Sequence, residues 1–152
     1  MNTYKFLVAT VAAAVLLGSG AAYAGPSVTV TFKHVGVSGS AQAAYSKVSA
    51  NENSTYVNAR PKPLTLINAG ETNTYTVQSQ ISPDSNYASV RYKIGSRTCV
   101  FTTTFVNAIG PGGVKTPRWN KSQTASGGAT CTATTTSVNY VTKEWAVEFT
   151  MK

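Results

Sequence analysis

Residues 88–106, ASVRYKIGSRTCVFTTTFV, decide the fold of this chain. Apolar and polar side chains alternate through 88–94 and, after the turn residues Gly95-Ser96, again through 98–106. One apolar face then collects Val90, Tyr92, Ile94, Cys99, Phe101 and Phe105. Alternation of period two is typical of a strand with one buried face, so the stretch predicts two consecutive strands that share a core.

The same alternation recurs elsewhere in the chain, at residues 28–32, 64–67, 74–81, 130–138 and 144–151. Turn residues separate these segments, a spacing typical of a sandwich or barrel. Beyond residue 24, no window longer than ten residues shows an apolar stripe at helical spacing. Residues 41–45 fit either one helical turn or the start of a strand over 43–48. We therefore expect an all-β fold, an antiparallel β-sandwich of about seven strands.

Residues 107–129, NAIGPGGVKTPRWNKSQTASGGA, interrupt this pattern with 23 residues that show no sustained period. A connection of this length is uncommon in a compact domain and is usually functional or disordered. Glycines mark both of its ends, and its centre holds the densest basic cluster of the chain. The sequence therefore predicts one long basic loop here.

The first 24 residues, MNTYKFLVATVAAAVLLGSGAAYA, have the anatomy of a secretory signal peptide. Lys5 supplies the basic start, residues 6–17 the apolar segment, and Ala22-Tyr23-Ala24 the small-x-small cleavage site. The apolar segment is too short to span a bilayer as a helix. We expect cleavage after Ala24, a single β-sandwich domain over 25–152 with no transmembrane segment, and an exported protein, periplasmic or secreted.

Cys99 and Cys131 are the only two cysteines. An exported chain with an even cysteine count predicts a disulfide, and the spacing fits no zinc or C-x-x-C redox motif. The bond would contribute roughly 3 kcal/mol in the chain-entropy model. The bond would also fix the C-terminal end of the 107–129 segment, because Cys131 follows just after it.

The chain is basic, with 13 Lys and Arg against 5 Asp and Glu. A positive field attracts polyanions, here an anionic lipid, lipopolysaccharide or glycan surface, with a protein partner as a further possibility; the alternative is that the charge serves solubility alone. The basic residues are scattered rather than grouped in one block, and export places the protein away from intracellular nucleic acid. We therefore do not expect nucleic acid as a partner.

The sequence lacks an obvious catalytic set. His34 is the only histidine, and Glu144 and Glu148 would lie about 13 Å apart on one strand face, too far to act as a pair. No phosphate-cradling loop or metal motif is present. We expect a non-enzymatic protein without a cofactor or metal site.

The best candidate for a ligand site lies within 107–129 and consists of Lys115, Arg118, Trp119 and Lys121. A tryptophan beside cations can stack on a sugar or sit at a lipid interface while the charges bind phosphate or carboxylate. The alternative is that Trp119 packs back onto the core and the basic groups remain in water.

Short segments at 63–72, Val90-Arg-Tyr92 and Trp145-Ala-Val-Glu-Phe149 are similar to aegerolysin-like lipid-binding sandwiches over about a third of the mature chain. The shared residues are general strand and turn residues, and the basic charge and the leader differ from that family. We therefore assign no family and carry over no site residue. The resemblance adds weight only to a membrane surface as partner.

The sequence thus predicts an exported binding protein that engages an anionic envelope or host-surface ligand, a lipid head group or glycan, through the basic Trp-bearing segment. Two alternatives stay open: a membrane-active or pore-forming effector, and a pilus-like surface-assembly subunit. The latter would need an open sheet edge completed by a partner strand.

Overall fold

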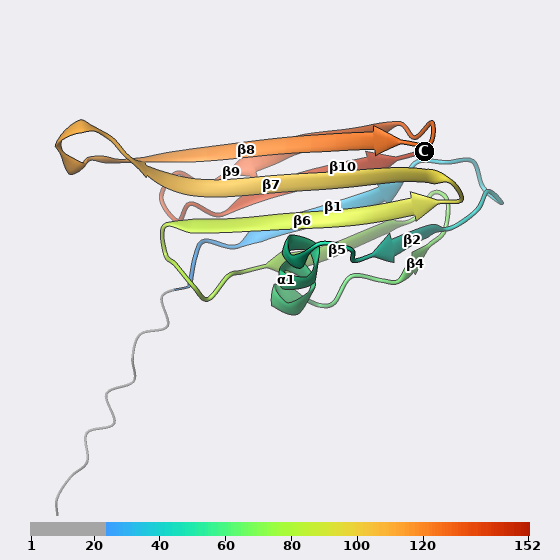
Figure 1. The fold of residues 1–152 in the computed structure, drawn as a ribbon, viewed down its shortest axis with the longest axis horizontal. Helices are drawn as coiled ribbons and strands as arrows, with labels where there is room; N and C mark the ends of the chain where they lie inside the picture. Colours follow the sequence, from blue (N-terminus) through green and yellow to red (C-terminus); the bar gives the residue numbers. More distant parts are fainter. Residues whose placement is uncertain (1–23) are drawn as a thin grey trace, which may run out of the picture.

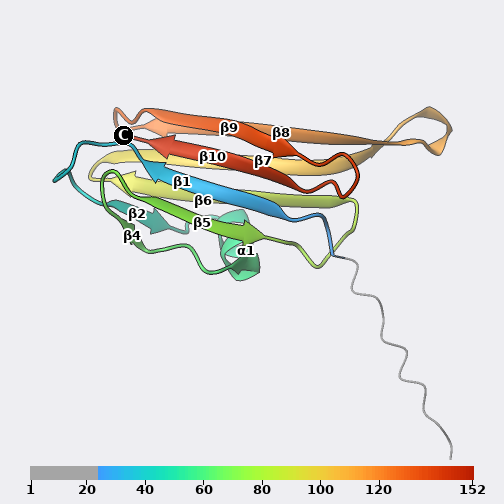
Figure 2. The same ribbon diagram turned by 180° about the vertical axis from the view of Figure 1, so that it is seen from behind.

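The computed structural model describes residues 24–152, so the expected signal peptide lies, apart from Ala24, outside the described residues. Two five-stranded sheets form the body (Figure 1, Figure 2). The first has the order β3-β5-β1-β10-β9, with bounds Ala59–Arg60, Thr72–Val77, Val28–His34, Trp145–Met151 and Cys131–Val138. The second has the order β4-β2-β6-β7-β8, with bounds Leu66–Ile67, Ala43–Ser46, Ser85–Ile94, Arg97–Ile109 and Lys115–Ser126. The helical elements are α1 (Ala50–Asn58) and the single turn η1 (Pro111–Gly113). The all-β prediction is confirmed.

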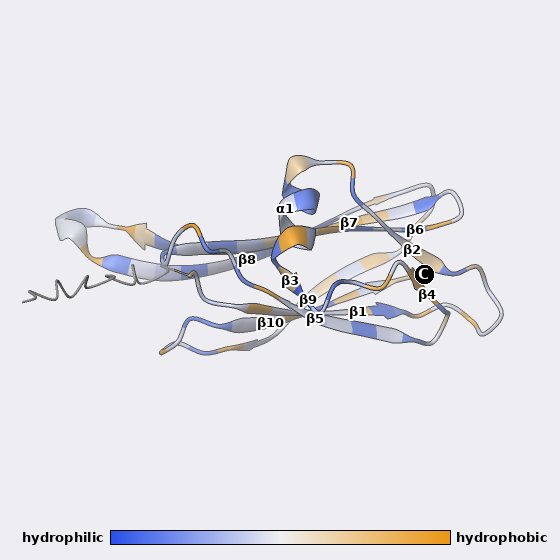
Figure 3. Ribbon diagram, turned by 90° about the horizontal axis from the view of Figure 1, so that it is seen from below, coloured by the Kyte–Doolittle hydropathy of each residue, from blue (hydrophilic) through white to orange (hydrophobic). Residues whose placement is uncertain are grey.

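The two sheets face each other across one aromatic core (Figure 3). Phe32 of β1 stacks on Tyr92 of β6 with ring centroids 3.5 Å apart, and Phe101 of β7 stacks on Phe149 of β10 at 4.7 Å. All four rings are completely buried. The alternating faces that the sequence predicted for β6, β7 and β10 therefore supply both sides of this core.

The expectation of a purely antiparallel arrangement is wrong for one pair, because β1 and β10 run parallel. Val28 lies opposite Trp145 and His34 opposite Met151, so the first and last strands are neighbours. Periodicity reports which face of a strand is buried and says nothing of strand direction. The remaining strand pairs are antiparallel.

Helix α1 was not expected from apolar periodicity. It begins at a capping box, in which the Ser49 side chain accepts a hydrogen bond from the Glu52 N–H and the Glu52 carboxylate accepts one from the Ser49 N–H. The helix packs beside β6: Thr55 Oγ1 accepts from the Ser89 N–H at 2.8 Å, and Glu52 pairs with Arg91 at 2.9 Å. Its contacts are thus largely polar, which explains why no apolar stripe marks it.

The long loop expected over 107–129 is not a loop. It contains the end of β7, the η1 turn and all of β8, which pair antiparallel from Ile109↔Lys115 to Thr98↔Ser126. Strand β6 begins only at Ser85, opposite Val106, so the outer part of this hairpin extends beyond the neighbouring strand (Figure 1). Almost every residue of β8 is exposed on both faces, and a strand without a buried face carries no period-two signal.

The disulfide prediction is confirmed: Cys99 and Cys131 are bonded, with Cα atoms 5.8 Å apart. Cys99 lies on β7 of one sheet and Cys131 on β9 of the other, so the bond connects the two layers. Of the two readings left open for residues 41–45, the strand is correct, because β2 pairs with β6 from Ala44 to Ser46.

Candidate functional site

The strand register separates the residues of the predicted basic site. Trp119 lies opposite Phe105, and Lys121 opposite Thr103, whose side chains are both buried between the sheets. Since side chains alternate along a strand, Trp119 and Lys121 lie on that inner side and Arg118 on the outer side of β8. The hairpin therefore does not gather the predicted site residues on one face.

Trp119 is partly buried against the edge of the core. Its ring lies 5.4 Å from the ring of Phe105 and 5.4 Å, edge to face, from that of Tyr140. Its indole Nε1–H donates a hydrogen bond to the Lys143 carbonyl at 3.2 Å. Trp119 thus fastens β8 to the turn between β9 and β10, which brings that turn beside the hairpin.

Three connections lie at the same end of the molecule: the loop 78–84, the turn 139–144 and, projecting beyond both, the tip of the β7–β8 hairpin (Figure 1). We call this end the hairpin end. Each connection exposes large apolar side chains, namely Ile81 (86% exposed), Ile109 (73%), Val114 (66%), Tyr140 (70%) and Val141 (88%). Single exposed apolar residues need no explanation, but several on adjacent loops are the kind of patch that marks an interaction site.

Basic groups follow the hairpin tip along strand β8. Lys115 forms an ion pair with Asp84, and hydrogen bonds from Lys115 and Asn107 lower the pKa of the Asp84 carboxyl. Arg118 and Lys121 are exposed along β8, and within residues 24–152 neither has a carboxylate within ion-pair distance. The hairpin end therefore combines exposed apolar side chains with positive charge.

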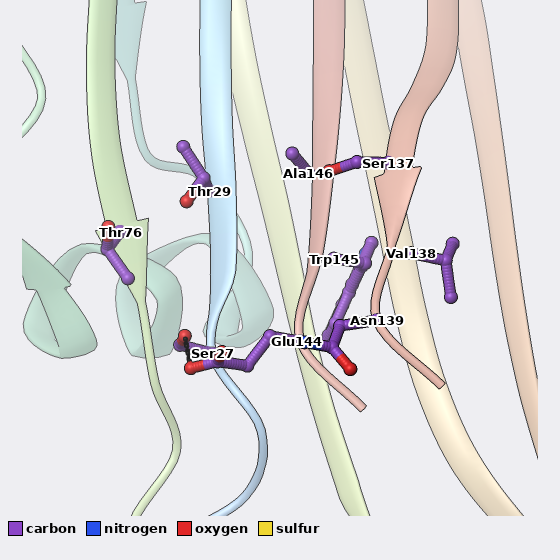
Figure 4. A pocket seen from close by; sticks show the side chains of 9 residues that line it. All are labelled: Ser27, Thr29, Thr76, Ser137, Val138, Asn139, Glu144, Trp145 and Ala146. Atoms are coloured by element: carbon purple, nitrogen blue, oxygen red, sulfur yellow. Dashed lines mark hydrogen bonds between the residues drawn. The ribbon is translucent and has the colours of Figure 1, made fainter. Parts of the chain in front are cut away.

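A shallow groove of about 370 Å³ begins at the 139–144 turn and crosses the outer face of the β5-β1-β10-β9 sheet (Figure 4). Hydroxyl and amide side chains line much of it, among them Ser27, Thr29, Thr76, Ser137 and Asn139. Its only charged side chain, Glu144, accepts hydrogen bonds from the Ser27 and Thr142 hydroxyls at 2.9 and 3.0 Å. A carboxylate in the groove disfavours an anionic ligand there, so the basic groups along β8 are the better place for one.

His34, the only histidine, is fully buried and its ring nitrogens are both engaged. Its Nδ1 accepts a hydrogen bond from the Gly36 N–H at 3.1 Å, which makes Nε2 the protonated nitrogen that donates to the Ala41 carbonyl at 2.9 Å. The ring thus fixes the connection between β1 and β2. Within residues 24–152, no three His, Cys, Asp or Glu side chains are grouped as metal ligands.

No helix within residues 24–152 has the length and apolar character needed to span a membrane. Comparison of the chain with protein-family models, with curated proteins and with solved structures finds no match.

Proposed function

We propose that this is an exported, non-enzymatic β-sandwich protein that binds anionic lipid surfaces with its hairpin end. The observation that carries the proposal is the group of exposed apolar side chains on three adjacent connections, edged by basic residues. The partner class is an anionic envelope or host membrane, as the basic composition of the chain predicts.

The two kinds of side chain would act together at a bilayer surface. Burial of an exposed Ile or Val side chain contributes roughly 1.5 kcal/mol or more. Tyr140 fits the polar–apolar boundary, where tyrosine is enriched. Each Lys or Arg close to an anionic membrane adds about 1 kcal/mol. Ile109 and Val114 at the hairpin tip would enter the interface, while Arg118 and Lys121 contact head groups.

The predicted site residues receive different roles in this proposal. Arg118 and Lys121 are head-group contacts on opposite faces of β8, behind the projecting part of the hairpin, and Lys115 joins them nearer the tip. Trp119 is a positioning residue, because its hydrogen bond and ring contacts keep the 139–144 turn beside the hairpin.

Cosedimentation with vesicles tests the proposal. The full chain should bind phosphatidylglycerol-containing vesicles and bind pure phosphatidylcholine vesicles much more weakly. The double variant Ile109→Ser/Val114→Ser should reduce the affinity about tenfold or more. Arg118→Gln/Lys121→Gln should reduce it by a similar factor and weaken the salt dependence.

Two substitutions at the opposite end serve as matched controls. Val37→Ser removes a side chain that is 82% exposed, and Lys93→Gln removes an exposed charge on β6. Neither should alter vesicle binding; equal losses in control and hairpin variants would exclude the hairpin end as the contact. Dye release from the same vesicles would favour the pore-forming alternative, and concentration-dependent polymers without lipid binding would favour the surface-assembly alternative.

A further inference from the structure

A second group of basic residues lies beside helix α1, away from the hairpin end. The Lys47 ammonium lies 3.7 Å from the ring centroid of Tyr56, and that of Lys62 lies 5.1 Å from the same centroid. Arg60 follows two residues after the helix. We call Lys47, Tyr56, Arg60 and Lys62 the α1 cluster.

Two of these cations are held in place by the end of the helix. Lys62 Nζ donates to the carbonyls of Tyr56 and Val57 at 2.6 and 2.7 Å. Arg60 Nη1 donates to the carbonyls of Val57 and Ala59 at 2.9 and 2.7 Å. Cations at the C-terminal end of a helix also interact favourably with its dipole. The positions of both charged groups are therefore fixed before any ligand arrives.

Hydrogen-bond donors remain after these contacts. Arg60 keeps the N–H groups of Nε and Nη2, Lys62 keeps one N–H, and Lys47 keeps all three. Within residues 24–152, Lys47 Nζ makes no hydrogen bond to the protein; its only close partner is the face of the Tyr56 ring. The unused donors come from Lys47 and Lys62 beside the Tyr56 ring and from Arg60, which shares the Val57 carbonyl with Lys62. Several cationic donors close together are a suitable arrangement for an oxyanion.

Within residues 24–152, none of the cluster cations forms an ion pair with a carboxylate. The ion pairs among the described residues join Glu52 to Arg91, Asp84 to Lys115 and Glu148 to Lys33. Desolvation and the positive charges of Arg60 and Lys47 lower the pKa of Lys62. The three cations thus repel one another, and the nearby Glu52 carboxylate is paired with Arg91 instead.

Unsatisfied polar groups lie next to the cluster. The ring of Tyr45 on β2 lies 6.0 Å from that of Tyr56, and the hydroxyls of Tyr45 and Ser46 are buried without a hydrogen-bond partner. Buried polar groups normally have partners, so each of these hydroxyls, on opposite faces of β2, marks a point where the protein alone does not complete its hydrogen bonding.

We infer that the α1 cluster is a binding site for a tetrahedral oxyanion, a phosphate or sulfate group carried by a ligand. Lys47 and the remaining donors of Arg60 and Lys62 contact the oxygens, and Tyr56 fixes the Lys47 ammonium through its ring. The site does not depend on the hairpin end and stands apart from the function proposed above.

Titration of the full chain with inorganic phosphate and with sodium sulfate, followed by backbone amide NMR at constant ionic strength, tests the site. We expect saturable shifts at residues 47, 56, 60 and 62 with a dissociation constant in the millimolar range, typical of a small ion at an exposed site. Lys47→Gln should weaken binding about fivefold or more, because a charge-assisted contact is lost. Lys47 makes no hydrogen bond to the protein, so this variant keeps the fold intact.

Lys93→Gln is the matched control, since it removes an exposed lysine of strand β6 outside the cluster, and it should leave the titration unchanged. Shifts that never saturate, or equal weakening by Lys47→Gln and Lys93→Gln, would show only general charge attraction and overturn the site. Vesicle binding is compared in the Ile109→Ser/Val114→Ser variant, which weakens the contact proposed for the hairpin end. In that variant, phosphate that binds as tightly as phosphatidic acid vesicles identifies a soluble ligand, whereas much tighter vesicle binding that Lys47→Gln removes identifies a lipid head group. Ile109→Ser/Val114→Ser should leave phosphate binding intact, so the two proposals can fail separately.

Discussion

The indole Nε1–H of Trp119 donates to the carbonyl of Lys143, and this contact joins the edge strand of one sheet to a turn of the other. The hydrogen bond crosses from β8 to the turn that precedes β10, and the ring of Tyr140 covers the indole from the same turn. Trp119 therefore connects the two layers at the hairpin end. The Cys99–Cys131 disulfide connects the same two layers near the start of β7.

This contact leads to a stability prediction for Trp119. Trp119→Phe should lower the free energy of unfolding by about 1 kcal/mol, the usual cost of one hydrogen bond. Trp119→Ala should cost about 2 kcal/mol or more, because the packing on Phe105 and Tyr140 is lost as well. Urea unfolding followed by circular dichroism measures both, and equal values for the two variants would contradict a role for the indole N–H.

The Glu52–Arg91 pair predicts loss of stability in acid. Burial of Glu52 would raise its pKa, but hydrogen bonds from Val48, Arg91 and Ser49 outweigh this and lower the pKa below its ordinary value of 4.5. Its contribution is therefore complete above the ordinary pKa and is lost as the pH falls through the lowered value. At neutral pH, Glu52→Gln should cost about 2 to 3 kcal/mol, since Glu52 is buried.

The comparison of unfolding curves at neutral and acidic pH measures this effect. The difference between wild type and Glu52→Gln should shrink as the pH falls below the ordinary carboxyl range. Glu148→Gln is the control: its partner Lys33 is 42% exposed, so the substitution should cost no more than about 0.5 kcal/mol. A Glu52→Gln deficit that stays constant with pH would refute the assignment.

The hydroxyls of Tyr75 and Tyr92 form a buried hydrogen bond of 3.1 Å between the two sheets. Tyr75→Phe leaves the Tyr92 hydroxyl unsatisfied and should cost about 1 to 2 kcal/mol, whereas the double variant Tyr75→Phe/Tyr92→Phe should cost less than the sum of the single variants. Additive losses in a double-mutant cycle would show that the hydroxyls do not interact.

The same pair predicts how the protein responds to alkali. Burial is the largest cause that raises the pKa of both Tyr75 and Tyr92. The native state then holds their protons where the unfolded chain releases them, so this contribution is complete below the ordinary pKa of 10.0 and falls as the pH rises above it. Absorbance at the tyrosinate band should show these two residues ionising only together with unfolding.

Gly127 in the β8–β9 turn predicts a large effect from one methyl group. Its φ is +64°, and a Cβ there would lie 2.1 Å from the carbonyl oxygen of Ser96. Gly127→Ala should therefore cost about 2 kcal/mol more than Gly128→Ala, where φ is also positive but the surrounding space is open. Thermal unfolding of the two variants measures the difference, and equal melting temperatures would contradict the close contact.

The parts of the fold that the sequence predicted are those with one buried face. Strands β1, β5, β6, β7 and β10 alternate because one side contacts the core, and period two records that contact directly. The disulfide followed from the cysteine count together with the expected leader. The exposed strand β8 gave no such signal, and neither did the parallel pairing of β1 with β10.

The helix was missed for a different reason, since its signal is chemical rather than periodic. Ser49 and Glu52 match the capping-box pattern, which could have identified the start of α1. The predicted site residues were grouped because they are close in sequence, but the strand register places Arg118 and Trp119 on opposite faces. The exposed apolar side chains of the hairpin end come from three separate segments of the sequence. Only the folded chain shows that these three segments lie at the same end of the molecule.

The parallel pairing of β1 and β10 also determines when the first sheet can be completed. Val28 and Trp145 are neighbours across this pair, and the adjacent Ser27–Glu144 hydrogen bond spans 117 positions of the chain. Contacts between residues so distant in sequence form late and slowly. Until residues 145–151 are available, β9 has no partner in its sheet and β1 pairs only with β5. Strand β9 therefore cannot join β1 in this sheet until β10 has been synthesised.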